Sequence, residues 1–264
     1  MYKRQIKVGE TAIITVIVSP GVTGNVTVIV NGKSETVNVT DGNATLKVAN
    51  LAANKYDVTV IYNGNDNYNV AKANASFVVS KVSDYKMNVT VPTIIAGENV
   101  VIEVSLPKDA TNNVTVVINN KKYTAAVLNG SAKVIIPGLT AGKYNMSVSY
   151  SGDDKYLASS NSTSFTVSKI DDYQIIVATP GIIAGENGII YVSLPDGATG
   201  TITVKINNKT YVVNVTGDVT EIAIDPLEEG VVMITTTYSG DNKYASKVEN
   251  GNITVVHNPC LLYT

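Results

Sequence analysis

The sequence predicts an all-β protein made of three tandem antiparallel β-sandwiches, each with about seven short strands. Three observations lead to this fold class. A seven-residue stretch that begins and ends with tyrosine occurs at 62–68, 150–156 and 238–244, with 88 residues between copies. Apolar residues make up 44% of the chain and are mostly valine and isoleucine, which favour strands. Apolar and polar residues alternate between closely spaced turn signals, and no helical period occurs.

The 88-residue spacing predicts the domain organisation. No insertion interrupts it, since Leu51 recurs as Leu139 and Leu227. A repeat of this length exceeds the roughly 20 to 50 residues of a solenoid unit and suits an independent domain. A propeller would need blades of about 45 residues. We therefore predict three domains, at residues 1–81, 82–169 and 170–259.

The second repeat shows the expected strands most clearly. Apolar residues occupy every second position from 100 to 106, as in a strand with one buried face. The pair Asn119-Asn120 supplies the two left-handed residues of a type I′ hairpin, as Asn31-Gly32 does in the first repeat. The predicted strands run through residues 86–91, 100–106, 114–118, 123–128, 132–136, 144–150 and 165–167. This pattern is typical of a seven-strand sandwich.

Composition excludes several classes of function. The net charge is −2 and basic residues do not cluster, so the electrostatic footprint of a nucleic-acid-binding protein is missing. No apolar run reaches the roughly 18 residues that a membrane span needs. The segments that connect successive repeats, at 79–85 and 167–173, are called the first and second joins. They are short and contain no glycine run, so we expect neighbouring domains of one longer chain to be closely linked.

Both ends of the chain look foreign. Residues 1–5 resemble the translation of GTGTATAAGAGACAG, and residues 260–264 resemble that of TGTCTCTTATACACA, which are opposite strands of one transposase adapter. We therefore expect a fragment whose native sequence excludes Cys260, the only cysteine. The first repeat has no counterpart of residues 85–91, so we expect it to lack its first strand and to be the least stable domain.

The repeated tyrosine-bounded loop allows two interpretations. In the first, it is a fold-specifying hairpin turn in which each glycine takes a positive φ and the tyrosines anchor the strand end to a backbone partner. In the second, Asp66, Asp153, Asp154 and Asp241 are calcium ligands, although one or two carboxylates per loop are few for a Ca²⁺ site. We favour the turn. Its residues are Tyr62, Gly64, Tyr68, Tyr150, Gly152, Tyr156, Tyr238, Gly240 and Tyr244.

Carboxylates in the joins are a second candidate for Ca²⁺. Asp84, Asp171 and Asp172 lie where an ion between domains would stiffen the chain, but solvated turn acids are the simpler interpretation. We expect no resident cofactor or metal.

The sequence predicts no catalysis. A glutamate recurs after glycine as Glu10, Glu98 and Glu186, and we expect it to cap turn N–H groups. No second acid or base recurs beside it, whereas catalysis usually needs a nucleophile with a base or a pair of carboxylates. The only histidine is His257, near the end of the chain.

The densest short motif is Asn-x-Ser/Thr, the acceptor pattern for N-glycosylation. Its number is about twice the chance expectation, and an asparagine- and threonine-rich surface remains the alternative. The twelve asparagines are Asn25, Asn38, Asn43, Asn74, Asn88, Asn113, Asn129, Asn145, Asn161, Asn208, Asn214 and Asn252.

Taken together, the motifs resemble a known repeat type. The Ala-Gly-Glu turn, the Leu-x-Ala-Gly-Lys-Tyr stretch at 139–144, Tyr-Ser-Gly-Asp-x-Lys-Tyr and the closing Phe-x-Val-Ser-Lys are similar to the bacterial-type Ig-like repeats of large surface adhesins, above all those of methanogenic archaea. The third repeat departs from the pattern with Val231-Val232 and Ile253, which keep the inward positions apolar. The resemblance implies three tandem Ig-like sandwiches in the extracellular part of an anchored cell-surface protein.

Two functions remain open at this stage. The first is a non-catalytic stalk that projects a distal domain from the cell envelope. The second is an adhesion module whose loops bind carbohydrate or a surface protein of a partner cell. The chain has 2 phenylalanines and no tryptophan, which argues against an aromatic platform for sugars. We favour the stalk.

Overall fold

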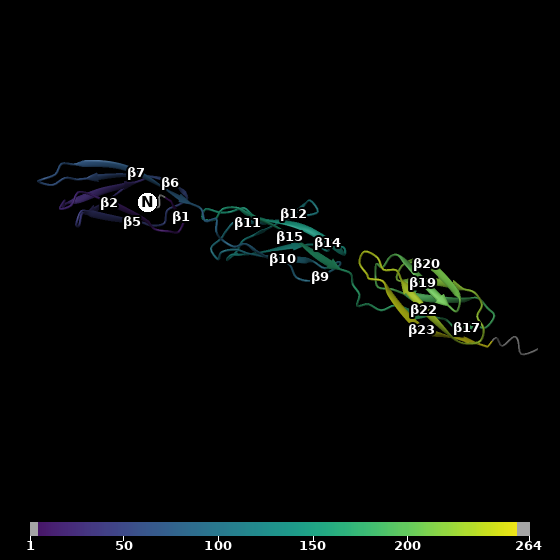
Figure 1. Ribbon diagram of the computed structural model, residues 1–264. Helices are drawn as coiled ribbons and strands as arrows, with labels where there is room; N and C mark the ends of the chain where they lie inside the picture. The colour runs from purple at the N-terminus through teal and green to yellow at the C-terminus, as the bar shows by residue number, and fades with distance from the viewer. Residues whose placement is uncertain (1–4, 258–264) are drawn as a thin grey trace, which may run out of the picture. The chain divides into compact units, whose positions relative to one another are not determined.

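The computed structural model describes residues 5–257 and confirms the predicted fold class. Those residues form three β-sandwiches of two sheets each and contain no helix (Figure 1). No helix long and apolar enough to cross a membrane therefore occurs in this range. The predicted foreign tail at 260–264, and all of the predicted foreign start except Gln5, lie outside the described residues.

The first sandwich is built from the strands of residues 5–80. Its strands are β1 (Gln5–Lys7), β2 (Ala12–Ile17), β3 (Asn25–Val30), β4 (Lys33–Asn38), β5 (Asn43–Val48), β6 (Asn54–Tyr62) and β7 (Ala71–Ser80). They form one sheet in the order β1-β7-β6-β3-β4 and a two-stranded sheet of β2 and β5. The described part of this repeat, which begins at Gln5, contains no strand before β1.

The second sandwich has the same order with one strand more. Its strands are β8 (Asn88–Thr90), β9 (Ile94–Ile95), β10 (Val100–Ser105), β11 (Asn113–Ile118), β12 (Lys121–Ala126), β13 (Ser131–Ile136), β14 (Gly142–Tyr150) and β15 (Ser159–Ser168). The sheets run β12-β11-β14-β15-β9 and β13-β10-β8.

The third sandwich repeats the second. Its strands are β16 (Ile176–Ala178), β17 (Ile182–Ile183), β18 (Gly188–Ser193), β19 (Thr201–Ile206), β20 (Lys209–Asn214), β21 (Val219–Ile224), β22 (Gly230–Tyr238) and β23 (Lys247–Val256). The sheets run β17-β23-β22-β19-β20 and β16-β18-β21. Backbone contacts group the whole chain into two compact units, with a boundary inside the second repeat, so the predicted limits of three domains stay a prediction.

Local sequence explains most of these elements. On β10, the alternating Val100, Ile102 and Val104 are fully buried, as the period of two predicted. Asn119 and Asn120 both have positive φ, at 48° and 62°, which confirms the type I′ hairpin between β11 and β12. The inward residues of the third sandwich form one apolar core that includes Ile190, Ile202, Ile222 and Tyr238.

One feature was not predicted. Each sandwich carries a very short strand that pairs in parallel with its last strand: Ile6 pairs with Val79, and Ile94 pairs with Val167. The strand β17 repeats this pairing in the third sandwich. The antiparallel description therefore holds for all but one short strand in each sandwich.

Candidate functional site

The repeated loop follows the strand that ends at a tyrosine in each sandwich. Its glycines, Gly64, Gly152 and Gly240, have φ values of 79°, 75° and 73°. A Cβ atom built on Gly152 would lie 2.7 Å from the backbone nitrogen of Ala158. Both the backbone conformation and the lack of space therefore require glycine at this position.

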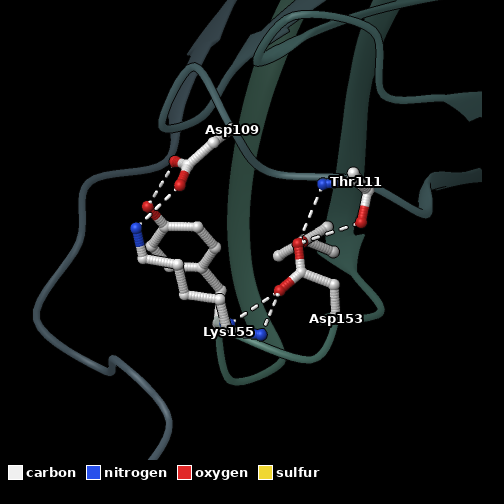
Figure 2. Close-up of polar contacts among 6 residues, drawn as sticks. Asp109, Thr111, Asp153 and Lys155 are labelled. Atoms are coloured by element: carbon white, nitrogen blue, oxygen red, sulfur yellow. Dashed lines mark hydrogen bonds and ion pairs between the residues drawn. The ribbon is translucent and has the colours of Figure 1, made fainter. Parts of the chain in front are cut away.

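In the second sandwich the carboxylate of Asp153 is the centre of the loop (Figure 2). Its Oδ1 accepts hydrogen bonds from the backbone N–H groups of Lys155 and Tyr156, at 2.8 and 2.7 Å. Its Oδ2 accepts one from the backbone N–H of Thr111 at 2.8 Å and one from the Tyr150 hydroxyl at 2.7 Å. The carboxylate therefore joins this loop to the β10–β11 connection of the same sandwich.

These contacts keep the buried acid ionised. Burial by itself raises the pKa of Asp153, but the hydrogen bonds from Thr111, Tyr156, Tyr150 and Lys155 outweigh it and lower the pKa to about 2. Burial and the neighbouring carboxylate raise the pKa of Tyr150, so this phenol stays protonated and donates. The carboxylate oxygens are thus engaged by donors of their own sandwich.

The third and first sandwiches vary this arrangement. Asp241 accepts from the N–H groups of Lys243 and Tyr244, both at 2.7 Å; burial raises its pKa, but these and further hydrogen bonds lower it overall. In the first sandwich Asn65 takes the same position, and its Oδ1 accepts from the Tyr68 N–H at 2.9 Å. The amide nitrogen of Asn65 donates to the carbonyl of Thr23 at 3.1 Å, where an acid could not donate.

The other candidate calcium ligands lie apart from this centre. Asp66 and Asp154 are exposed loop residues, and Asp171 and Asp172 are exposed in the second join. Asp84 in the first join forms an ion pair with Lys7 at 2.5 Å. Within residues 5–257, no three His, Cys, Asp or Glu side chains come close enough to hold a metal ion.

The tyrosines that precede the loop anchor it in two ways. The Tyr62 hydroxyl donates to the backbone carbonyl of Thr23 at 2.8 Å, and Tyr238 donates to that of Thr199 at 2.6 Å, as expected of a tyrosine corner. The Tyr150 hydroxyl donates to the carboxylate of the loop described above, and it also has a hydrogen bond with the backbone of Thr111, the residue equivalent to Thr199. The hydrogen bond to the buried, charged carboxylate 2.7 Å away is stronger than a hydrogen bond to a neutral backbone carbonyl.

Sequence reasoning missed the partners of the loop that come from the start of the repeat. Val82 forms a parallel bridge with Tyr156, and the Tyr85 hydroxyl donates to the carbonyl of Leu157 at 2.5 Å. Ile170 and Tyr173 make the same contacts in the third sandwich. The signal was present in the sequence, because the tyrosine of the first join recurs in the second at the 88-residue spacing.

A second missed residue is Asp109. One of its oxygens accepts from the Tyr156 hydroxyl and the other pairs with the Lys155 ammonium, both at 2.7 Å (Figure 2). No repeat signal could reveal it, because Gly21 and Gly197 occupy the equivalent positions. Glu10, by contrast, caps a turn as expected, since its carboxylate accepts from a backbone N–H at 2.9 Å.

Comparison with known sequences decides the family. Residues 2–80 and 87–168, more than half of the chain, match the family described as bacterial Ig-like domain (group 3). The chain belongs to this family. The matched ranges are the first and second Ig-like repeats, and they support the Ig-like part of the resemblance. A comparison with curated proteins finds no significant match.

Solved structures resemble the Ig-like repeats only distantly. A two-domain fibronectin type III segment of chicken tenascin is 13% identical, with a TM-score of 0.41, over 65% of this chain and 100% of that one. The fibronectin(III)-like modules of Clostridium thermocellum CbhA are 15% identical, with a TM-score of 0.27, over 65% of this chain and 95% of theirs. Escherichia coli alpha-2-macroglobulin is 10% identical, with a TM-score of 0.26, over 96% of this chain and 22% of that one.

The predicted glycosylation sites lie at the surface of the Ig-like repeats. Eleven of the twelve asparagines are exposed, and Asn25 is half-buried. Asn129 has a φ of 51° in the turn between β12 and β13. The side chain of Asn74 is less available for glycosylation, because its oxygen accepts a hydrogen bond from the Thr59 hydroxyl at 3.0 Å. Occupancy of these sites stays a prediction.

Proposed function

We propose that this chain is a non-catalytic spacer segment of an adhesin-like protein on the cell surface, of the type found in methanogenic archaea. Its Ig-like sandwiches would form part of a stalk that projects a distal domain from the cell envelope. Extracellular placement is supported by the bacterial Ig-like family, whose members are typical of surface proteins.

One observation carries the proposal: the best-marked residues of the repeat are used to hold each sandwich together. The carboxylate of Asp153 bonds to three backbone N–H groups and one phenol of its own sandwich. A carboxylate engaged in this way is poorly placed to bind a ligand or to accept a proton near neutral pH. Selection for a stable repeated unit explains the motif without a bound partner.

A glycan array tests the spacer function. The chain of three Ig-like sandwiches, labelled at an exposed lysine, should bind no glycan more strongly than the background. Specific binding at micromolar concentration to any glycan would overturn the proposal of a pure spacer. Intact-mass measurement on native material would show in parallel which predicted glycosylation sites are occupied.

A second candidate, adhesion through protein contact, is favoured by a local feature of the third sandwich. Val231 and Met233 on β22 are 69% and 74% exposed. The equivalent positions hold Lys143 and Asn145 in the second repeat. Exposed apolar side chains at positions that are polar elsewhere in the chain suit a protein interface better than a sugar site.

The double variant Val231→Lys/Met233→Asn tests this second candidate, because it restores the residues of the second repeat. If the third sandwich mediates adhesion, attachment of the chain to partner cells should drop at least tenfold in this variant. Equal attachment of the original chain and the variant would argue against adhesion through these residues and would leave the spacer as the only candidate function. The thermal unfolding of the variant should be unchanged, which serves as the control.

A further inference from the structure

Five asparagine–glycine pairs occur in the described part of the chain, and the structure places them in different surroundings. In such a pair the backbone nitrogen of the glycine can attack the side-chain amide of the asparagine, because the glycine has no Cβ to obstruct the approach. The attack also needs a backbone that can rotate and a side-chain amide that is not held elsewhere. The pairs are Asn31-Gly32, Asn63-Gly64, Asn129-Gly130, Asn187-Gly188 and Asn250-Gly251.

Two of the pairs are fixed by strands. Asn250 lies within β23 and pairs with Thr235 of β22. Its side-chain oxygen also accepts a hydrogen bond from the Thr235 hydroxyl at 2.9 Å. Gly188 is buried at the start of β18, where a Cβ atom would lie 3.1 Å from the side chain of Ile224. In both pairs, rotation of the backbone would disrupt a sheet.

Two further pairs lie in packed turns. Gly130 is buried, and a Cβ atom built on it would lie 2.6 Å from the carbonyl oxygen of Pro107. The side-chain nitrogen of Asn63 donates to the side chain of Asn25 and, at 3.0 Å, to the Thr27 hydroxyl. The first of these pairs therefore lacks space for a new ring, and in the second the amide is already engaged.

The pair Asn31-Gly32 is not restrained in any of these ways. It forms the turn between β3 and β4, with φ values of 45° and 79°, and both residues are exposed. A Cβ atom built on Gly32 would meet no atom within 4 Å. Within residues 5–257, neither the Asn31 side chain nor the Gly32 N–H has a hydrogen-bond partner. Because Lys33 follows, the asparagine is not in an Asn-x-Ser/Thr motif, so no N-linked glycan would cover it.

We propose that Asn31 is a site of spontaneous covalent modification, which converts to aspartate and isoaspartate in the folded protein while the other four pairs persist. The Gly32 backbone nitrogen gives up its proton and forms a bond to Cγ of Asn31. The bond from Cγ to Nδ2 breaks, ammonia leaves with that proton, and a five-membered succinimide ring remains. No oxidant or reductant takes part.

Water from the solvent then opens the ring at one of its two carbonyl carbons. Attack at Cγ restores the ordinary backbone and leaves aspartate. Attack at the backbone carbonyl carbon breaks its bond to the Gly32 nitrogen, so the chain continues through Cγ and the residue is isoaspartate. One water is consumed and one ammonia is released, and either product carries a new carboxylate.

The same turn in the other two repeats lacks the reactive pair. Asn119-Asn120 and Asn207-Asn208 take its place at the 88-residue spacing. The first residue of each turn has the backbone conformation of Asn31, with φ values of 48° and 51°. A side chain on the second residue obstructs the approach of its nitrogen and restricts its φ. Among these three turns, the modification is therefore confined to the first sandwich.

Isoaspartate would loosen the hairpin that carries it. It adds one methylene to the backbone between Val30 and Lys33, which face each other at the end of the β3–β4 ladder. The length of a two-residue turn sets the register of its hairpin. Since β4 lies at the edge of its five-stranded sheet and pairs there with β3, we expect the loss of hydrogen-exchange protection to be confined to this hairpin.

The test incubates the full chain in mildly alkaline buffer and follows each pair by peptide mass mapping, in which either product adds one mass unit. In the folded chain, Asn31 should convert at least tenfold faster than the asparagine of any other pair. In concentrated urea all five pairs should convert at similar rates, because the difference between them comes from the fold. Hydrogen exchange of the incubated chain should show lost protection in β3 and β4 only.

Gly32→Asn is the matched variant, since it installs the pair that the second repeat carries in the same turn. It should slow conversion of Asn31 at least tenfold and leave thermal unfolding unchanged. The comparison of folded and urea-unfolded chain stands by itself if the variant folds poorly.

Three results would overturn the proposal. The first is conversion of another pair in the folded chain as fast as that of Asn31. The second is a folded chain in which Asn31 persists while all five pairs convert in urea. The third is an unchanged rate at Asn31 in a folded Gly32→Asn variant, which would place the attacking group elsewhere.

Discussion

The ring of Tyr85 meets the ring of Tyr156 edge-on, with 5.2 Å between their centroids. The first residue comes from the start of its repeat and the second from the loop before the last strand. Tyr173 and Tyr244 have the same relationship in the third sandwich, at 5.5 Å. In the second and third sandwiches the repeated loop is therefore held from two sides, by the starting segment of the repeat and by the aspartate at its own centre.

Replacement of the buried acid should destabilise the second sandwich. Asp153→Ala leaves three backbone N–H groups and the Tyr150 hydroxyl without their acceptor, so we expect a loss of about 3 kcal/mol in the free energy of unfolding. Urea unfolding followed by circular dichroism measures it. The exposed neighbour provides the control, since Asp154→Ala should change stability by less than about 0.5 kcal/mol. Equal effects of the two substitutions would contradict this account.

The same acid should make stability depend on pH in the acid range. Because folding lowers the pKa of Asp153 to about 2, its contribution is complete above the ordinary pKa of the group and is lost as the pH falls through the folded value. A shift of this size corresponds to about 2 kcal/mol. Unfolding measured between about pH 6 and 2 should show this loss. Asp153→Asn removes the titrating group, so a variant with an unchanged pH profile would argue against the assignment.

The loop glycine should tolerate no side chain. Gly152→Ala places a Cβ 2.7 Å from a backbone nitrogen in a residue with a φ of 75°, so we expect at least about 2 kcal/mol of destabilisation. Gly181 is the matched control, because a Cβ there meets no atom within 4 Å and its φ is not positive. Thermal unfolding of both variants compares them. Similar melting temperatures for the two variants would contradict the prediction.

The first sandwich should open before the other two. Its inward residues Ile14 and Val16 are half-buried, while Ile102 and Val104 are fully buried, so less apolar area is removed from water. Hydrogen exchange in increasing urea should show loss of protection first in β2 and β5. If protection of these strands is lost last, the partial exposure of Ile14 and Val16 does not limit stability.

Calcium should leave the stability unchanged. The Asp153 carboxylate is already engaged by five hydrogen-bond donors, so an ion would have to displace them. Thermal unfolding in millimolar calcium and in chelator should give superimposable curves. A rise of several degrees in calcium would instead indicate a site among the loop or join carboxylates.

Much of the fold could be predicted because the same local sequence patterns recur from one repeat to the next. Alternation predicted every boundary of β10 to β14 to within two residues, since one face of each strand is buried and side chains alternate across a strand. The left-handed pair at Asn119 and Asn120 was predicted because few residues adopt positive φ. These signals are local, and each occurs in more than one repeat.

The remaining features depend on contacts between distant residues. A two-residue parallel strand such as β9 has no period to detect, so its pairing with β15 could not be predicted. The contacts of Asp109 could not be found by repetition, because the other repeats have glycine there. At the candidate site, the sequence indicated which loop matters and favoured the turn, but the structure was needed to distinguish Asp153 from Asp154.

The hydrogen bond from Tyr85 to Leu157 joins residues 72 positions apart, and this separation sets an order of events during synthesis. The starting segment of a repeat leaves the ribosome well before the loop that will hold it. Until then its tyrosine and its alternating apolar residues have no partner in their own sandwich. Contacts this distant in sequence form late in folding and slow it. Each sandwich held in this way can therefore be completed only after the loop before its last strand has been made.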